Sequence, residues 1–520
     1  MTPVPAGADA KHPPAIEARG INRWFGLVHA NRDVSLAVPR GTIHGIIGEN
    51  GAGKSTLMSI LYGLYQPDSG EILVDGQLVR FRSPQDALKA GIGMVHQHFK
   101  LVDTFTAIEN VVLGAEGGFR LKDAMAGARA ELERLGRDYH LEVPADALIG
   151  DMNVGQRQRV EILKALYRGA RILILDEPTG VLTPQEADHL FRILGALKRE
   201  GKTVILISHK LREILAVTDN VTVMRQGRAV AEVRTAATSK EELAELMVGR
   251  KVLLRVEKTA ARPGEVVLDV ADLRVADGAG IERGKGGSFQ VRRGEIVGMA
   301  GVAGNGQSEI LEALAGIRPI TGGRIRWKGV DITGDAKART AKGMRHLGLS
   351  HVPEDRQRMG LVAEFAANES AILGFHEDRP YNRGALLDHG IVRHECERQM
   401  AEYDVRPANA NLPTSAFSGG NQQKIVVARE VDHNPDVLMV GQPTRGVDIG
   451  AIEFIHRRLV ALRDAGKGIL LVSVELDEIL ALADRILVVF DGRIVGELTP
   501  AQANERAIGL MMAGMNAEAA

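Results

Sequence analysis

Residues Gly48–Ser55 read GENGAGKS, a glycine-rich run that ends in lysine and serine. The apolar segment Thr42–Ile47 before it has the composition of a strand, and Thr56–Tyr62 after it continues as a helix. Glycines at this spacing let consecutive backbone amides turn toward phosphate oxygens, and the following helix directs its positive end at them. Lys54 would neutralise phosphate charge, and the Ser55 hydroxyl would ligate Mg²⁺. The run therefore predicts a phosphate-binding loop between a strand and a helix.

A second strand-like run, Ile172–Leu175, ends in the acidic pair Asp176 and Glu177. A carboxylate at the end of a buried strand is costly unless it meets a cation, and Asp176 can do so through a metal ion or its water. Glu177 would then face the terminal phosphate and polarise the attacking water. An acidic strand end is weak evidence by itself, but behind a phosphate-binding loop it predicts a hydrolytic site.

The pattern around the loop occurs twice in the chain. Gly41–Leu64 and Gly294–Gly316 each combine an apolar run, a glycine-rich turn and an amphipathic segment. Lys54 and Gln307 are 253 residues apart, whereas three later pairs are each 265 residues apart. These pairs are Gln156 with Asn421, Asp176 with Gly441, and His209 with Val474. The constant later offset predicts two copies of one domain, the second longer by twelve residues in its middle.

Brief β-branched strands that alternate with helical stretches are typical of a mostly parallel sheet covered on both faces. We therefore expect an α/β fold with two tandem P-loop nucleotide-binding domains. The expected boundaries are a disordered lead-in at 1–13, a first domain at 14–250, a short linker at 251–263 and a second domain at 264–514.

The composition excludes several function classes. The 520 residues carry a formal net charge of −1, which argues against nucleic acid as a main partner. The one cysteine, Cys396, excludes a disulfide within the chain and a metal cluster built from cysteines. No apolar run approaches the roughly 18 residues that a membrane-spanning helix needs. These features predict a soluble protein of a reducing compartment.

With these motifs in view, both copies resemble the ATP-binding cassettes of ABC transporters. GENGAGKST resembles the Walker A motif and ILILDEP the Walker B motif. The resemblance implies ATP with Mg²⁺ as the cofactor, and it assigns Gln97 to the Q-loop and His209 to the switch that holds the γ-phosphate. Phe25 stands where the family has an aromatic residue that stacks on adenine. The nucleotide-contacting residues so implied are Gly48, Glu49, Asn50, Gly51, Ala52, Gly53, Lys54, Ser55 and Thr56. The implied Mg²⁺ ligands are Ser55, Gln97 and Asp176. The implied catalytic residues are Glu177, His209 and Gln97.

The signature motif of the family, usually LSGGQ, reads FSGGN at Phe417–Asn421 and MNVGQ at Met152–Gln156. In the family, two cassettes pair head to tail, so that each ATP lies between one P-loop and the signature of the other cassette. The resemblance thus implies a first composite site that joins the first P-loop to the second copy. The residues that the second copy contributes are Ser418, Gly419, Gly420, Asn421 and Asp448.

The other composite site departs from the family pattern at nearly every position. Gln307 replaces the lysine, Gly441 the Walker B aspartate and Gln442 the catalytic glutamate. The further replacements are Glu309, Glu354 and Val474 in the second copy and Asn153 and Thr183 in the first. Because these losses come from distant stretches yet fall into one composite site, we expect one working hydrolytic site and one degenerate site.

Two further segments, His351–Val362 and Phe417–Lys424, look like those of the fused double cassettes of sugar and nucleoside importers, and Val95–Gly114 is closer to the nucleoside branch. The resemblance implies an ATPase at the cytoplasmic face of the cell membrane. Its partners would be two transmembrane permease subunits, which make the membrane contact, and an extracytoplasmic substrate-binding lipoprotein, with no nucleic acid. A soluble double-cassette ATPase acting on translation is the alternative, which would need a long basic linker and two intact sites. A non-hydrolysing regulator is a third, which the intact first site disfavours.

Overall fold

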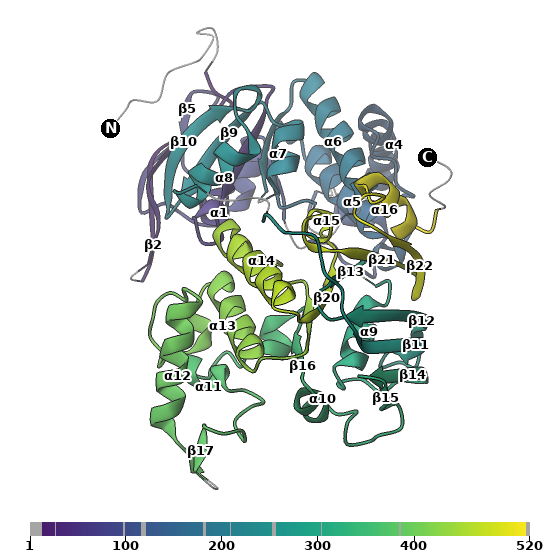
Figure 1. Cartoon of the computed structure of the whole chain (residues 1–520). Helices are drawn as coiled ribbons and strands as arrows, with labels where there is room; N and C mark the ends of the chain where they lie inside the picture. The colour runs from purple at the N-terminus through teal and green to yellow at the C-terminus, as the bar shows by residue number, and fades with distance from the viewer. Residues whose placement is uncertain are drawn as a thin grey trace. The chain divides into compact units, whose positions relative to one another are not determined.

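The computed structural model describes residues 13–26, 28–96, 99–115, 121–179, 182, 184–208, 210–251, 256–302, 304–383 and 386–515 (Figure 1). The chain divides into two compact units, Met1–Val252 (unit 1) and Leu253–Ala520 (unit 2). The division falls inside the segment expected to be a linker. The expected lead-in lies outside the described residues except for Pro13.

The core of unit 1 is a six-stranded sheet with the order β10-β9-β3-β8-β7-β6. The pairs β3/β8, β3/β9, β7/β8 and β6/β7 are parallel, and β10 runs antiparallel to β9. Every residue of β3 and β8 is buried, as expected for strands covered on both faces. The strands are β3 (Ile43–Gly48), β6 (Ile92–Val95), β7 (Ile172–Asp176), β8 (Thr203–Ile207), β9 (Asn220–Arg225) and β10 (Arg228–Arg234).

A second, antiparallel sheet of unit 1 has the order β2-β1-β4-β5. Its apolar residues form one core with α1 and with one face of the central sheet, which fixes α1 at the end of β3. The helices α3, α4 and α5 pack on one another and form the helical subdomain. The strands are β1 (Ile16–Phe25), β2 (Val28–Val38), β4 (Ser69–Val74) and β5 (Gln77–Val79). The helices are α1 (Lys54–Leu61), α2 (Pro84–Lys89), α3 (Ala107–Val112), α4 (Leu121–Tyr139), α5 (Val154–Tyr167), α6 (Pro184–Arg199), α7 (Leu211–Val217) and α8 (Lys240–Val248).

Unit 2 repeats this architecture with a central sheet β16-β19-β20-β13-β21-β22 and an antiparallel sheet β12-β11-β14-β15. The central strands are β13 (Ile296–Ala300), β16 (Leu349–Val352), β19 (Val437–Gly441), β20 (Gly468–Ser473), β21 (Arg485–Phe490) and β22 (Arg493–Leu498). The others are β11 (Val266–Ala276), β12 (Glu282–Arg292), β14 (Gly322–Trp327) and β15 (Val330–Asp331), with a hairpin of β17 (Asn382–Arg383) and β18 (Leu386–Leu387). The helices are α9 (Gln307–Leu314), α10 (Ala341–Leu347), α11 (Ala367–Ala371), α12 (His389–Glu402), α13 (Gly419–Asp432), α14 (Ile449–Asp464), α15 (Leu476–Leu482) and α16 (Glu505–Met512).

The central sheets of the two units confirm the α/β fold and its tandem repeat. The first residues of β6 and β16 are 257 residues apart, and those of β7 and β19 are 265 apart. Four of the twelve extra residues therefore precede β16, and eight lie in the helical region between β16 and β19. In the part of the chain that the structure describes, no helix is both long enough and apolar enough to cross a membrane.

Candidate nucleotide site

The turn from β3 into α1 requires glycine at both ends. Gly53 caps α1 in the left-handed region, with φ 94°, and a Cβ there would lie 2.4 Å from the carbonyl oxygen of Ala30. A Cβ on Gly48 would lie 2.3 Å from the carbonyl oxygen of Met224. Side chains at these positions would push the loop away from β2 and β9, so the loop keeps its course only with glycine.

Lys54 lies at the start of α1 and is only 6% exposed. Its ammonium group donates hydrogen bonds to the carbonyl oxygens of Gly48 (2.7 Å) and Glu49 (3.0 Å). Burial lowers the pKa of Lys54, and the nearby carboxylates of Glu177 and Asp176 oppose that effect. The cation is thus held inside its own loop, where phosphate oxygens can take over from the carbonyl groups.

Two carboxyl groups lie at the end of β7 near this lysine. Burial, and then the charge of Glu177, raise the pKa of Asp176 to about 6, while Lys54 works in the opposite direction. Glu177 adopts a left-handed backbone with φ 46°, and its amide donates to the carbonyl oxygen of Ile207 at 2.9 Å. A non-glycine residue in this region is strained, and such strain is concentrated at functional sites.

Gln97, His209 and Thr183 lie outside the described residues. The strands that lead to the first two are described: β6 ends at Val95 and β8 ends at Ile207. Both strands pair in parallel with β7. Because parallel strands end at the same edge of a sheet, Gln97 and His209 remain predicted neighbours of Asp176.

Phe25 is 40% exposed at the end of β1, as a residue that stacks on a base must be. Tyr65, which the sequence reasoning missed, lies edge-on to it with ring centroids 5.3 Å apart. The guanidinium of Arg23 lies 4.9 Å from the centre of the Phe25 ring. The only sequence signal for Tyr65 was its place just after α1, and adenine stacking by Phe25 stays a prediction.

The corresponding loop of unit 2 keeps its shape without the lysine. Gly306 caps α9 with φ 96°, and a Cβ there would lie 2.1 Å from the carbonyl oxygen of Arg283. Gln307 is 2% exposed, and its amide group donates to the carbonyl oxygen of Val302 at 2.8 Å. An amide therefore takes the internal contact that the ammonium group makes in unit 1, without the charge.

Glu354 fills the space that a Walker B aspartate would need in unit 2. A Cβ on Gly441 would lie 2.5 Å from Cγ of Glu354 and 2.8 Å from Cδ2 of Leu311. The Ser308 hydroxyl donates to Glu354 Oε2 at 2.7 Å, while burial raises the pKa of Glu354. Gln442 keeps the left-handed backbone of Glu177, with φ 47°. The backbone of the site is thus retained, while its acidic group comes from Glu354, two residues after the end of β16.

The predicted signature residues of unit 2 gather at the start of α13. Ser418 caps this helix, and its hydroxyl accepts a hydrogen bond from the side-chain amide of Asn421 at 2.9 Å. A Cβ on Gly420 would lie 2.5 Å from Oδ2 of Asp448, and one on Gly419 would lie 2.4 Å from a guanidinium nitrogen of Arg356. The glycines thus let Asp448, the cap of α14, approach the helix start, and such a start suits an anion.

The corresponding segment of unit 1, at the start of α5, forms hydrogen bonds between its own side chains and amides. Asn153 caps α5, and its Oδ1 accepts a hydrogen bond from the amide of Gln156 at 2.8 Å. The Gln156 side chain in turn accepts from the Asn153 amide at 3.1 Å. This capping box satisfies the amides of Asn153 and Gln156 with side chains of the same helix start.

The sequence pattern of the family described as ABC transporter matches residues 31–180 and 285–445. The chain belongs to this family. It is 47% identical to the nucleoside import ATP-binding protein NupA of Lactococcus lactis subsp. cremoris (strain MG1363), an alignment that covers 96% of this chain and 98% of NupA. It is 46% identical to the guanosine import ATP-binding protein NupO of Bacillus subtilis (strain 168), over 96% of this chain and 97% of NupO. It is 45% identical to the glucose import ATP-binding protein TsgD13 of Haloferax volcanii, over 96% of both chains.

As a member of the ABC transporter family, the chain is an ATP-binding ATPase of a transport system. The residues of unit 1 fit a nucleotide with Mg²⁺. Asp176 and Glu177 form an acidic pair whose burial one lysine only partly offsets, and a hydroxyl and carboxylates are the hard oxygen ligands that Mg²⁺ prefers. Ser55 and Asp176 would hold the ion, and Mg²⁺ would neutralise phosphate charge there.

Proposed function

We propose that this chain is the ATP-hydrolysing subunit of a membrane importer for nucleosides or simple sugars, bound at the cytoplasmic face of the cell membrane. The support is full-length similarity to proteins named for import of nucleosides, guanosine and glucose. The two relatives with the higher identities are named for nucleoside and guanosine import, which favours nucleosides. No observation favours the translation alternative.

We infer further that one composite site hydrolyses ATP and the other does not. The observation that carries this proposal is that each unit keeps a different half of a complete nucleotide site. Unit 1 holds Lys54 beside Asp176 and Glu177, whereas unit 2 keeps both glycines of the signature at the start of α13. Head-to-tail pairing, as in the family, would unite these two halves with Ser418, Gly419, Gly420, Asn421 and Asp448 facing the first P-loop.

Each residue of this first site has a distinct task. Lys54 moves its hydrogen bonds from the carbonyl groups of its loop to phosphate oxygens. Ser55 and Asp176, together with Gln97, would hold the metal ion. Glu177 accepts a hydrogen bond from the attacking water and so orients it. The residues predicted to hold the γ-phosphate and the adenine are His209 and Phe25.

The second site lacks what hydrolysis needs. Gln307 carries no charge, Gly441 offers no ligand and Gln442 cannot act as a base. Loss of one charge-assisted contact weakens nucleotide binding roughly ten- to a hundredfold. We therefore propose that this site holds nucleotide weakly and does not turn it over.

The importer requires two permease subunits and an extracytoplasmic binding lipoprotein, which we propose as partners and as the parts that select the cargo. A deletion strain tests the cargo through uptake of radiolabelled nucleosides and of ribose. Complementation with the wild type should restore nucleoside uptake, and Glu177→Gln should not. If neither uptake depends on this chain, both substrate proposals fail.

The site assignment is tested by ATP hydrolysis in the complete transporter. Glu177→Gln should abolish turnover, because it removes the base while keeping the size of the side chain. The matched control is Gln442→Ala at the corresponding residue of unit 2, which should retain wild-type turnover. Substantial hydrolysis by Glu177→Gln, or its loss in the control, would overturn the assignment.

A further inference from the structure

A buried carboxyl group of α7 joins the segments that follow β7 and β8 in unit 1. Oε2 of Glu213 accepts hydrogen bonds from the hydroxyl groups of Thr179 at 2.5 Å and Ser208 at 3.0 Å. None of the three residues is more than 8% exposed. Such a network is strong inside a protein, because the local dielectric constant is low. We call this pair of hydrogen bonds the Glu213 bridge, and it links two segments that are far apart in the sequence.

The bridged segments carry two residues of the proposed hydrolytic site. Thr179 lies two residues after Glu177, and Ser208 directly precedes His209. At the end of the sheet, the amide of Glu177 donates to the carbonyl oxygen of Ile207 at 2.9 Å. Beyond this hydrogen bond both segments have left the sheet, and the bridge is the contact that joins them there.

The hydroxyl group of Ser208 is held from two sides. It accepts a hydrogen bond from the amide of Lys210 at 3.0 Å and donates one to Glu213. Because Ser208 and Lys210 flank His209 in the chain, the residues on both sides of His209 are connected to α7 through one hydroxyl group.

Unit 2 has the same three residue types without the bridge. The counterparts, each 265 residues later, are Thr444, Ser473 and Glu478. Oε1 of Glu478 lies 2.9 Å from Nε2 of His456 on α14. Its Oε2 is buried and has no hydrogen-bond partner within the described part of the chain. The carboxyl group of unit 2 therefore contacts α14 instead of the two hydroxyl groups.

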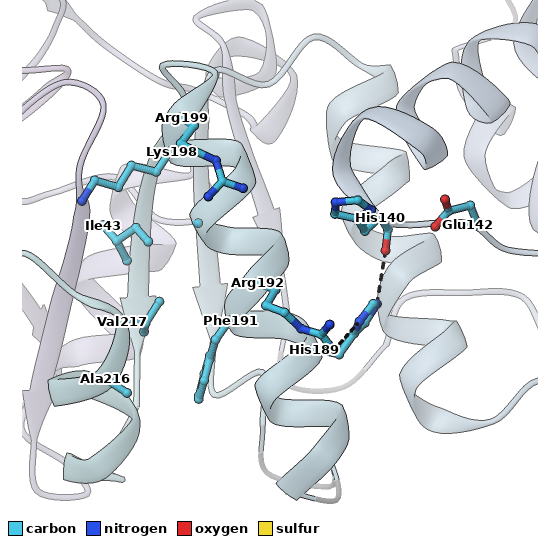
Figure 2. A pocket seen from close by; sticks show the side chains of 11 residues that line it. Ile43, His140, Glu142, His189, Phe191, Arg192, Lys198, Arg199, Ala216 and Val217 are labelled. Carbon is cyan, nitrogen blue, oxygen red and sulfur yellow. Dashed lines mark hydrogen bonds between the residues drawn. The ribbon is translucent and has the colours of Figure 1, made fainter.

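The residue that engages Glu478 is specific to unit 2. His456 stands where α6 of unit 1 has Phe191. Figure 2 shows Phe191 beside Ala216 and Val217 of α7, with which it lines a cavity. A phenyl ring donates no hydrogen bond of this kind, so this position of α6 does not compete with the two hydroxyl groups for the carboxyl group of α7.

A second contact differs between the units in the same way. Nε2 of Gln158 on α5 donates to the carbonyl oxygen of Pro178 at 2.7 Å. The counterpart in unit 2, Gln423, is 2% exposed, and its Nε2 has no hydrogen-bond partner among the residues that the structure describes. The segment after β7 is thus held at two adjacent residues in unit 1, whereas unit 2 has kept the side chains and lost the contacts.

We propose that Glu213 is a positioning residue for ATP hydrolysis in unit 1. It joins Thr179 to Ser208 and so keeps the segments that carry Glu177 and His209 at one separation. This inference rests on the proposed function of the first site. A small displacement of a catalytic group slows a reaction strongly. Loss of the bridge should therefore slow hydrolysis, while nucleotide binding, which depends on the phosphate-binding loop, is kept.

Single-turnover hydrolysis of ATP and equilibrium binding of a labelled ATP analogue in the complete transporter test this role. Thr179→Val keeps the shape of the side chain and removes the donor. It should slow hydrolysis about ten- to a hundredfold and change nucleotide affinity by less than about twofold. Thr179→Ser restores a hydroxyl group and should recover most of the rate. In a Glu213→Leu background, Thr179→Val should cause no further loss, because its partner is already absent.

The matched controls are Thr444→Val and Ser473→Ala in unit 2, which should hydrolyse ATP at the wild-type rate because they have no bridge to lose. A wild-type rate in Thr179→Val, with none in Glu177→Gln, would overturn the role of the bridge and leave the proposed site standing. An equal loss of rate and affinity in Thr179→Val, or additive losses with Glu213→Leu, would also overturn it. Hydrolysis by Glu177→Gln would overturn the proposed site, and this inference with it.

Discussion

At the scale of single residues, the carboxyl group of Asp176 is held where its charge is disfavoured. Its pKa is raised from 3.8 to about 6, so the folded protein binds this proton more tightly than the unfolded chain does. Ionisation therefore costs stability, and the cost grows as the pH rises from about 4 to about 6 and is complete above it. We expect Asp176→Asn, free of metal and nucleotide, to be more stable than the wild type by about 1–3 kcal/mol at pH 8.

Urea unfolding of both proteins at pH 4 and pH 8 measures this difference, which should vanish at the lower pH. Addition of ATP with Mg²⁺ should stabilise the wild type more than the variant, because the variant has lost a carboxylate that positions the ion. An equal stability difference at both pH values would contradict the origin assigned to the shift.

A second prediction at this scale concerns Gly441, where a Cβ would lie 2.5 Å from Cγ of Glu354. Gly441→Asp should destabilise unit 2 by about 1–3 kcal/mol, because a well-packed site must move to accept the side chain. The double variant with Glu354→Gly frees that space and should recover most of the loss. Thermal unfolding of the three proteins compares them, and equal melting of the single and double variants would refute the steric coupling.

The chemistry of the site could be predicted residue by residue, because glycine, lysine and paired acids occur at spacings that phosphate and Mg²⁺ impose. Lys54, Asp176 and Glu177 do lie together in unit 1. The coupling of Glu354 with Gly441 could not be predicted. These residues are far apart in sequence, and only the neighbouring positions of β16 and β19 bring them into contact.

At the scale of elements, strands were predictable because their apolar runs are short, β-branched and buried on both faces. The role of the segment before β11 could not be predicted, because its sequence, VEKTAAR, has no periodicity and is typical of a linker. In the structure, Lys258 donates to the carbonyl oxygens of Leu482 and Ala483 and so caps the end of α15. Cations at a helix C-terminus are stabilising, and a linker residue has therefore become part of the packing of unit 2.

This contact leads to a prediction on local stability. Lys258→Met keeps the aliphatic stem but removes the charge, and it should destabilise α15 by about 1–2 kcal/mol. Hydrogen exchange of the amides of α15 and of α7 measures the effect, which should be confined to α15. The matched control is Lys251→Met at an exposed residue before the segment. Faster exchange in the control, or unchanged exchange of α15 in Lys258→Met, would contradict the capping role.

At the scale of the whole molecule, two copies of one fold have kept the same strand order while their sites have diverged in chemistry. The loops after β3 and β13 both need glycine, and Glu177 and its counterpart Gln442 both have a left-handed backbone. The scaffold has thus been retained where the catalytic groups have not. This pattern is expected if unit 2 still serves as a binding surface, since its signature must keep its geometry while its own P-loop need not react.

A last prediction follows from that asymmetry. It concerns Lys54 and Gln307, which occupy the same position in the two loops. Lys54→Gln, which copies unit 2, should weaken ATP binding roughly ten- to a hundredfold and abolish hydrolysis. The reverse exchange, Gln307→Lys, should strengthen binding at the second site without adding hydrolysis, because Gly441 provides no metal ligand and Gln442 no base. Equilibrium binding of a labelled ATP analogue and hydrolysis rates of the complete transporter measure both effects. Faster turnover in Gln307→Lys would mean that the lysine alone separates the two sites, and a fully active Lys54→Gln would mean that the working site lies elsewhere.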